Sequence, residues 1–144
     1  MTTPAVITTP RVTVAIGWLS LAGWDATQET GYPVLPGSEI LDMPDQAVFL
    51  TPSGGPGYAT EEAGTDSWAL QARLRGGSDD PLGAQAAAQL LDYTILHGPH
   101  PVQVAGVQVL NVQRLGSPPS PLPLDPSDRR FEYVTSYIFT TGGG

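Results

Sequence analysis

The sequence predicts an α+β fold, in which a mostly antiparallel sheet of about five strands carries helices packed on one face. Three observations lead to this expectation. Residues 68–75 alternate with the period of a strand, residues 80–97 carry the signals of a capped helix, and further strand patterns follow in the last third of the chain. At 144 residues the chain has the length of one domain, which is enough to bury a core without metal or disulfides.

The first half of the chain alternates short elements with long loops. Residues 1–10 hold two prolines and indicate an extended arm that precedes a single domain over 11–140. Residues 11–24 fit both a strand and a helix, and their length together with Gly23 at the end favours the helix. Turn-forming glycines and prolines with little periodicity indicate a loop at 25–46, and the apolar run 47–51 indicates a short strand.

A second loop is expected at 52–66, before the strand with the clearest alternation. Along 68–75, Trp68 and the apolar residues that follow it at every second position share one face. Arg73 and Arg75 point to the other face, and we expect that face to meet either a partner subunit or solvent.

The segment 80–97 is the clearest helix in the sequence. Asp80 is a suitable N-cap, Pro81 fits the first helical position, and Gly98 follows the end. A stripe of apolar residues is expected to pack on the sheet, each large member stabilising the fold by about 1.5–3 kcal/mol. The stripe consists of Leu82, Ala86, Ala87, Leu90, Leu91 and Ile95.

Strands are expected at 102–104 and 107–115, joined by a tight hairpin at Ala105 and Gly106. A proline-rich loop over 117–128 leads to a last strand with aromatic residues on one face. The segment 141–144, which ends in three glycines, indicates a flexible tail.

The charge of the chain restricts its partners. Fourteen acidic residues face six basic residues, all arginine, and the net charge is −8. Binding to DNA depends on clustered basic side chains, so the chain as a whole is expected to repel nucleic acid. There is no cysteine, no apolar run of the roughly 18–20 residues needed for a membrane span, and no signal-peptide pattern, so we expect synthesis in the cytoplasm and no membrane partner.

No set of residues predicts catalysis, a cofactor or a metal. The glycine-rich loop 54–57 superficially resembles a phosphate-binding loop, but that motif needs a lysine and the chain has none. His97 and His100 are separated by Gly-Pro, which favours a plain helix-end loop over a metal site. Glu61, Glu62 and Asp66 lack the spacing of calcium ligands and indicate a solvated acidic loop. We therefore expect a protein that is not an enzyme.

The prolines between residues 118 and 126 contain two PxxP spacings, which an SH3-like groove could bind. A stiff polyproline II connector is the simpler interpretation. Because a stiff loop loses little entropy on docking, it also suits a preformed contact between subunits. The candidate interface residues are Gly54, Gly55, Pro56, Gly57, Glu61, Glu62, Asp66, Arg73, Arg75, Pro119, Pro121 and Pro123.

Over residues 45–140 the chain resembles the tail terminator proteins of actinobacterial siphophages, also called minor capsid or tail completion proteins. The resemblance consists of features in a fixed order. They are a strand entering Gly-Gly-Pro-Gly, a strand ending Gln-Ala-Arg-x-Arg-Gly, an Asp-Pro-x-x-Ala helix, an Arg-x-Gly-x-Pro strand end, a Pro-Leu-Pro loop and an aromatic last strand.

The resemblance implies a virion protein of the tail or neck that forms a homohexameric ring. Such a ring caps the tail tube, stops its growth, and offers a surface to the head–tail connector protein. Its partners would be other copies of itself, the tail tube protein and the connector, with DNA only as passing cargo. The family has no catalytic residues to carry over.

Two other interpretations stay open. Another phage neck component, a head-completion or connector-stopper protein, would share much of this pattern. A small monomeric protein-binding module could use the proline-rich segment.

Overall fold

The structure is a computed structural model that describes residues 10–24, 32–37, 46–53, 59–60, 65–122 and 130–143. These residues form an α+β fold of two helices and seven strands. The elements are α1 Arg11–Leu21, β1 Val34–Pro36, β2 Ala47–Ser53, β3 Ala59–Thr60, β4 Thr65–Ser78, α2 Pro81–Leu96, β5 Val102–Val104, β6 Val107–Pro121 and β7 Arg130–Gly143.

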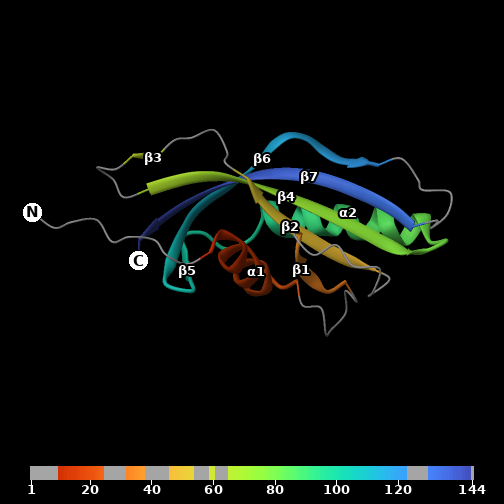
Figure 1. The fold of residues 1–144 in the computed structure, drawn as a ribbon, viewed down its shortest axis with the longest axis horizontal. Helices are drawn as coiled ribbons and strands as arrows, with labels where there is room; N and C mark the ends of the chain where they lie inside the picture. Colours follow the sequence, from red (N-terminus) through yellow and green to blue (C-terminus); the bar gives the residue numbers. More distant parts are fainter. Residues whose placement is uncertain are drawn as a thin grey trace, which may run out of the picture.

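The strands form one sheet in the order β1-β2-β4-β7-β6-β5, with β3 paired to β4 beside this path. All pairs are antiparallel except β1 with β2. The two longest central strands, β4 and β7, run together from Thr65 opposite Gly142 to Ser78 opposite Arg130. Figure 1 shows β4, β6 and β7 curving along the molecule, with α2 running alongside them.

Both predicted helices are confirmed, and their ends have the expected causes. At the start of α2 the Asp80 carboxylate accepts a 3.0 Å hydrogen bond from the Gly83 backbone N–H, which satisfies a free donor of the first turn. After α1 the chain leaves the helix at Gly23 with φ of +104°, a conformation that glycine adopts at little cost.

The core contains residues of both helices and of the sheet. Trp68 of β4 stacks on Phe139 of β7 at 4.9 Å, and Trp18 of α1 meets the same ring edge-on at 5.2 Å. Each indole N–H has an acceptor: Trp18 donates to the Pro99 carbonyl at 2.8 Å and Trp68 to the Thr141 hydroxyl at 3.1 Å. Large aromatic side chains are therefore buried without an unpaired indole N–H.

The predicted apolar stripe of α2 is wrong for two of its leucines and for Ala86, all of which are exposed. Leu82 is 77% exposed and Leu90 is 50% exposed. The residues of α2 that are buried are Ala84, Ala87, Ala88, Leu91, Asp92 and Ile95. Small side chains explain the difference: a Cβ on Gly76 of β4 would lie only 2.5 Å from the Ala84 Cβ. Alanine and glycine let the helix lie close to the sheet, so several larger residues face outward.

The two predicted loops in the first half contain strand residues. Within 25–46, Val34–Pro36 forms β1 and pairs in parallel with β2, Val34 opposite Val48. Within 52–66, β2 continues to Ser53, Ala59–Thr60 forms β3, and β4 begins at Thr65. Pairing with a neighbouring strand determines these short elements, and a two- or three-residue strand has no period to detect. These two strands raise the total above the expected five.

The predicted proline loop 117–128 is wrong up to Pro121, because β6 continues to that residue. Between Leu115, opposite Ser136, and Ser120, opposite Val134, the register shifts in a bulge. Prolines are tolerated there since β5 pairs only with Val107–Val109, and no described strand lies on that edge of β6 farther along. Proline has no backbone N–H to donate, but on this edge of β6 no described strand requires that hydrogen bond.

The predicted flexible tail 141–144 is also wrong for its first three residues. β7 extends to Gly143, where Gly142 pairs with Thr65 of β4 and Gly143 with Val107 of β6. Two neighbouring strands satisfy the backbone groups of this segment, so it needs no side chains of its own to stay in the sheet. By contrast, the predicted hairpin at Ala105 and Gly106 is confirmed, with φ of +51° and +79° as a type I′ turn requires.

Candidate functional site

The candidate interface residues fall into three groups. Seven of them lie outside the described residues: Gly54, Gly55, Pro56, Gly57, Glu61, Glu62 and Pro123. Arg73 and Arg75 of β4 lie at the same end of the sheet as Pro119 and Pro121 of β6, because β7 places Tyr133 between Leu74 and Pro121. Asp66 lies toward the other end of β4, opposite Thr141. The described candidates therefore do not form one continuous site.

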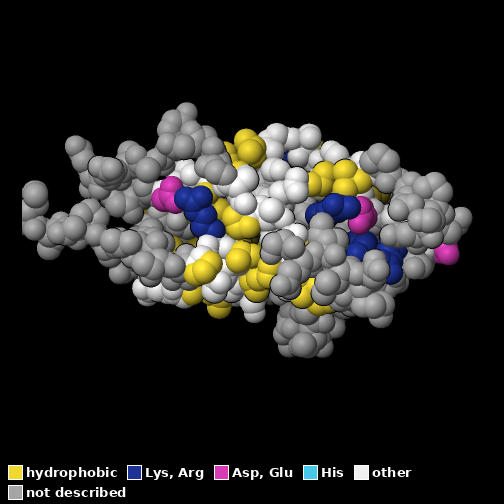
Figure 2. Space-filling model, viewed as in Figure 1, with side chains coloured by type: hydrophobic (Ala, Val, Ile, Leu, Met, Phe, Trp, Pro, Cys, Tyr) yellow, Lys and Arg dark blue, Asp and Glu magenta, His cyan; other side chains and the backbone are white. Residues whose placement is uncertain are grey.

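Arg11, Arg73 and Arg114 form ion pairs within the chain. Arg11 binds Asp66, Arg73 binds Glu132 at 2.5 Å, and Arg114 binds Asp92. Figure 2 shows arginine and acidic side chains adjoining in this way on one face of the molecule, with uncharged and hydrophobic surface between them. These arginines are already neutralised by their own chain.

The expectation that the arginine face of β4 is open is wrong at Arg75. Arg75 is only 3% exposed, and its guanidinium lies 5.1 Å above the centre of the Phe49 ring. Phe49 lies opposite Arg73 on the neighbouring strand β2, and its ring covers Arg75, the next arginine along β4. A cation over an aromatic face is attracted by the ring, which offsets part of the cost of burial. Replacing Arg75 by an acidic residue would therefore disturb the fold itself.

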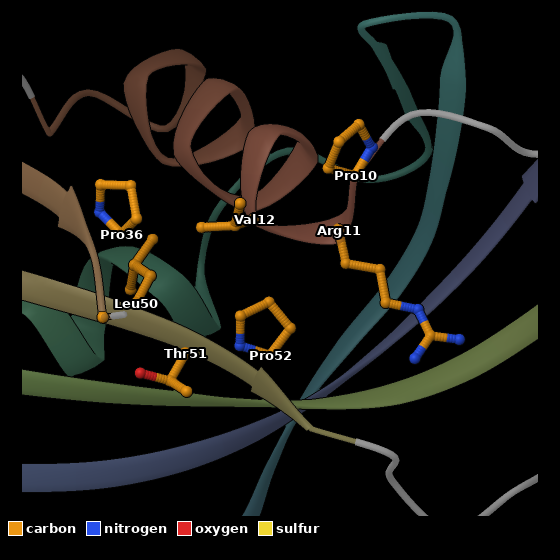
Figure 3. Close-up of a pocket in the computed structure, with 8 residues that line it drawn as sticks. Pro10, Arg11, Val12, Pro36, Leu50, Thr51 and Pro52 are labelled. Atoms are coloured by element: carbon orange, nitrogen blue, oxygen red, sulfur yellow. The ribbon is translucent and has the colours of Figure 1, made fainter. Parts of the chain in front are cut away.

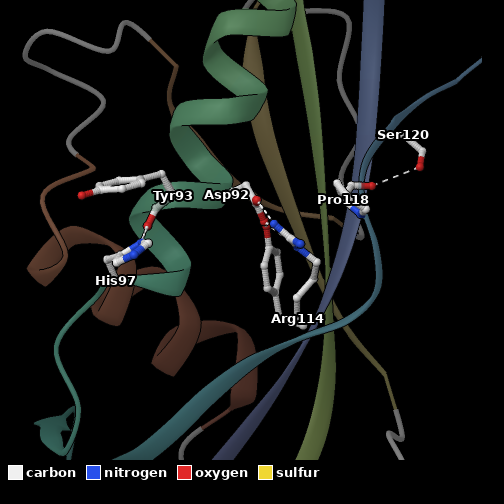
Figure 4. Close-up of polar contacts among 7 residues, drawn as sticks. Asp92, Tyr93, His97, Arg114, Pro118 and Ser120 are labelled. Carbon is white, nitrogen blue, oxygen red and sulfur yellow. Dashed lines mark hydrogen bonds and ion pairs between the residues drawn. The ribbon is translucent and has the colours of Figure 1, made fainter.

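A buried polar cluster connects α2 to β6 and β7, and the sequence patterns did not reveal it. Asp92 of α2, 8% exposed, accepts a 2.8 Å hydrogen bond from the Tyr137 hydroxyl and a 3.2 Å bond from Arg114 Nε. A second nitrogen of Arg114 binds the other carboxylate oxygen. Figure 4 shows Arg114 reaching from β6 to Asp92 on α2. The one available signal was that Asp92 is the single charged residue of the helix sequence.

Burial and the bonded Asp92 raise the pKa of the Tyr137 hydroxyl well above the ordinary 10.0. In the unfolded chain this tyrosine ionises near its ordinary pKa, whereas in the folded chain it stays protonated. Its contribution to stability is thus complete below about pH 10 and is lost as the pH rises above that value.

We therefore expect chemical denaturation to show a steeper loss of stability above about pH 10 for the wild type than for Tyr137→Phe. The phenylalanine variant keeps the ring and removes the titrating group. Two parallel stability curves from about pH 9 to pH 11 would contradict this account.

The outer face of α2 carries an apolar stripe, which we define as Leu82, Ala86, Leu90 and Tyr93. Their spacing of three and four residues places them on one side of the helix, and Tyr93 is 62% exposed. Tyr93 stacks on His97 at 4.1 Å, and the His97 ring bonds the Tyr93 carbonyl at 3.0 Å. In Figure 4 both rings lie on the side of α2 opposite Asp92.

Among the described residues, no cluster of three or more His, Asp or Glu side chains could hold a metal.

A groove opens between the start of α1, the end of β1 and the second half of β2 (Figure 3). Its volume is about 370 Å³. It is lined by Pro10, Arg11, Val12, Pro36, Gly37, Leu50, Thr51 and Pro52. Arg11 is the one charged residue of this lining, and it is engaged with Asp66 and with the face of Trp68, 5.7 Å from the ring centre. The groove is therefore mainly apolar.

No protein-family model matches the chain, and no curated protein shows significant similarity to its sequence. Neither α1 nor α2 is long and apolar enough to cross a membrane, and the described residues contain no other helix.

Proposed function

We propose that this chain is a phage tail terminator, a ring-forming structural protein that caps the tail tube. In this proposal the ring is a homohexamer located at the neck of the virion and assembled in the host cytoplasm. It stops polymerisation of the tail tube protein and then binds the head–tail connector protein. It has no catalytic role and carries no cofactor.

One observation carries the proposal: the ordered series of sequence features between residues 45 and 140. The Gln-Ala-Arg-x-Arg-Gly feature belongs to β4, the Asp-Pro-x-x-Ala feature begins α2, and the Arg-x-Gly-x-Pro feature falls at the bulge of β6. These three features therefore lie on β4, α2 and β6, which are among the longest elements of the fold.

The charge distribution supports a ring through which DNA passes. The net charge is −8, and Arg11, Arg73 and Arg114 are each bound to a carboxylate of the same chain. Arginines held in this way offer little to DNA phosphates, whose binding requires free cationic side chains. An acidic ring would let DNA pass without retaining it, provided that enough of its charge faces the channel.

The arrangement of the layers also supports a subunit with several contact surfaces. We propose that both helices lie on one face of the sheet, since Ala15 and Trp18 of α1 and Ile95 of α2 surround the same small void above Leu50, Leu70 and Phe139. The sheet edges, the outer face of α2 and the groove beside α1 then remain for neighbours in the ring, the tube and the connector.

Electron microscopy of tails from a phage lacking this gene tests the proposal. We expect tails of variable and excessive length that fail to join heads, and normal length when the wild-type chain is supplied. Tails of normal length that only fail to join heads would favour the alternative, a head-completion or connector-stopper protein. Normal infectious particles would contradict both.

A further inference from the structure

We infer that strand prolines block backbone pairing at both edges of the sheet, so that the sheet does not grow there by taking up further strands. An edge strand presents backbone N–H and C=O groups with which another chain could pair, and it is a site of aggregation unless it is protected. Side chains of the edge strands can still contact neighbours. The prolines have this role whatever larger assembly the chain belongs to.

Prolines are distributed in the described strands according to their position in the sheet. The central strands β4 and β7, which are paired on both sides, contain none. At one edge β1 contains Pro36, and its neighbour β2 contains Pro52. Toward the other edge β6 contains Pro118, Pro119 and Pro121, all in the part that β5 does not cover. Because a proline nitrogen carries no hydrogen, these positions cannot donate to an added strand.

The backbone hydrogen bonds at the β1 edge show where its prolines point. Gly37 donates its N–H to the Leu50 carbonyl at 2.8 Å, so these groups point across the gap between β1 and β2. Backbone groups of successive strand residues point to opposite sides, so the nitrogen of Pro36 points away from β2. By the same alternation Pro52, two residues after Leu50, points to the side of β1, whose pairing has ended at Leu50. No described strand lies opposite either proline nitrogen.

The β6 edge has the same arrangement. Leu122 N–H donates to the Glu132 carbonyl at 2.9 Å, so the backbone of Leu122 points to β7. Pro121, one residue earlier, therefore points away from β7, to the side of β6 on which no described strand lies. Pro118 and Pro119 fall in the bulge of β6, and bulges and prolines are among the features by which edge strands avoid pairing.

The charge of the chain protects these edges only in part. Two copies with a net charge of −8 each repel one another, but salt screens the repulsion between exposed charges. The absence of an N–H is not affected by salt. The two kinds of protection can therefore be separated, and at about 0.5 M salt we expect the prolines to supply most of it.

Replacing proline by threonine tests this role, because threonine restores the N–H and is favoured in strands. At about 0.5 M salt, we expect Pro121→Thr to associate at a protein concentration on the order of 10-fold below that of the wild type, since paired copies gain backbone hydrogen bonds. Sedimentation velocity measures the association, and infrared spectroscopy detects strands paired between chains. Ser120→Thr is the matched control, because it introduces the same side chain on a residue whose backbone points to β7.

Pro36→Thr repeats the test at the opposite edge, so that the test remains decisive if circular dichroism shows that one variant does not fold. We expect this variant also to associate more readily than the wild type. A folded variant of either kind that associates no more readily than the wild type and Ser120→Thr would overturn the inference. If native mass spectrometry of the same chain still showed rings, the proposed function would stand without this role of the prolines.

Discussion

Replacing Asp92 by alanine is expected to lower the free energy of unfolding by about 1–3 kcal/mol, because the buried Tyr137 hydroxyl is left without its acceptor. The carboxylate is the shared acceptor for Arg114 and for the fully buried Tyr137. Without it, two donors lose their acceptor at the place where α2 meets β6 and β7. Denaturation by urea, followed by circular dichroism, measures the effect.

A double-mutant cycle with Arg114→Met isolates the ion pair. Once Asp92 is absent, the arginine has no carboxylate partner there, so replacing it by methionine should recover part of the lost stability. A loss below about 1 kcal/mol for Asp92→Ala would show that the pair behaves like an exposed salt bridge and does not stabilise the packing of α2 against β6 and β7.

The second large effect concerns which side of α2 faces the sheet. Leu91→Ala should cost about 2–5 kcal/mol, because a buried leucine loses both its transfer free energy and its packing contacts. Leu91 is 4% exposed, whereas its neighbour Leu90 is 50% exposed. Leu90→Ala should therefore change the stability of the isolated chain by only about 0.5 kcal/mol. The two variants remove the same atoms one position apart.

Thermal or urea denaturation of the two variants decides between the faces. A loss for Leu90→Ala as large as that for Leu91→Ala would support the stripe predicted from the sequence, which contains both leucines, and would contradict the structure. The comparison should be made at low protein concentration, where contacts between copies do not add to the stability of Leu90.

The sequence predicted the elements whose signals are local. Asp80, Pro81 and Gly98 mark the ends of α2 through capping chemistry, and alternation from Trp68 to Leu74 marks β4. The turn at Ala105 and Gly106 follows from the backbone conformation that a two-residue hairpin needs. In each case neighbours along the chain determine the structure.

Predictions failed where distant partners determine the structure. The prolines after Gly116 indicated a loop, but pairing with β7 holds Ser120 and Pro121 in β6. The final glycines indicated a flexible tail, yet β4 and β7 pair through Gly142. Hydrophobic spacing also did not distinguish the two sides of α2, since both carry leucines and the close approach at Gly76 selects the alanine side.

The candidate site was the hardest part to predict from the sequence. Arg73 and Arg75 were expected on an open face, but Glu132 and Phe49, which bind them, lie far away along the chain. The Asp92, Arg114 and Tyr137 cluster joins three separate elements in the same way. No local pattern specifies such a meeting of residues.

Native mass spectrometry of the purified chain, with electron microscopy of the same sample, tests the central claim most directly. The proposed function predicts a ring of six copies, each of 15.1 kDa, with a central opening. A closed ring of another number would favour a different neck component. A single 15.1 kDa species at high protein concentration, without ring particles, would contradict the account.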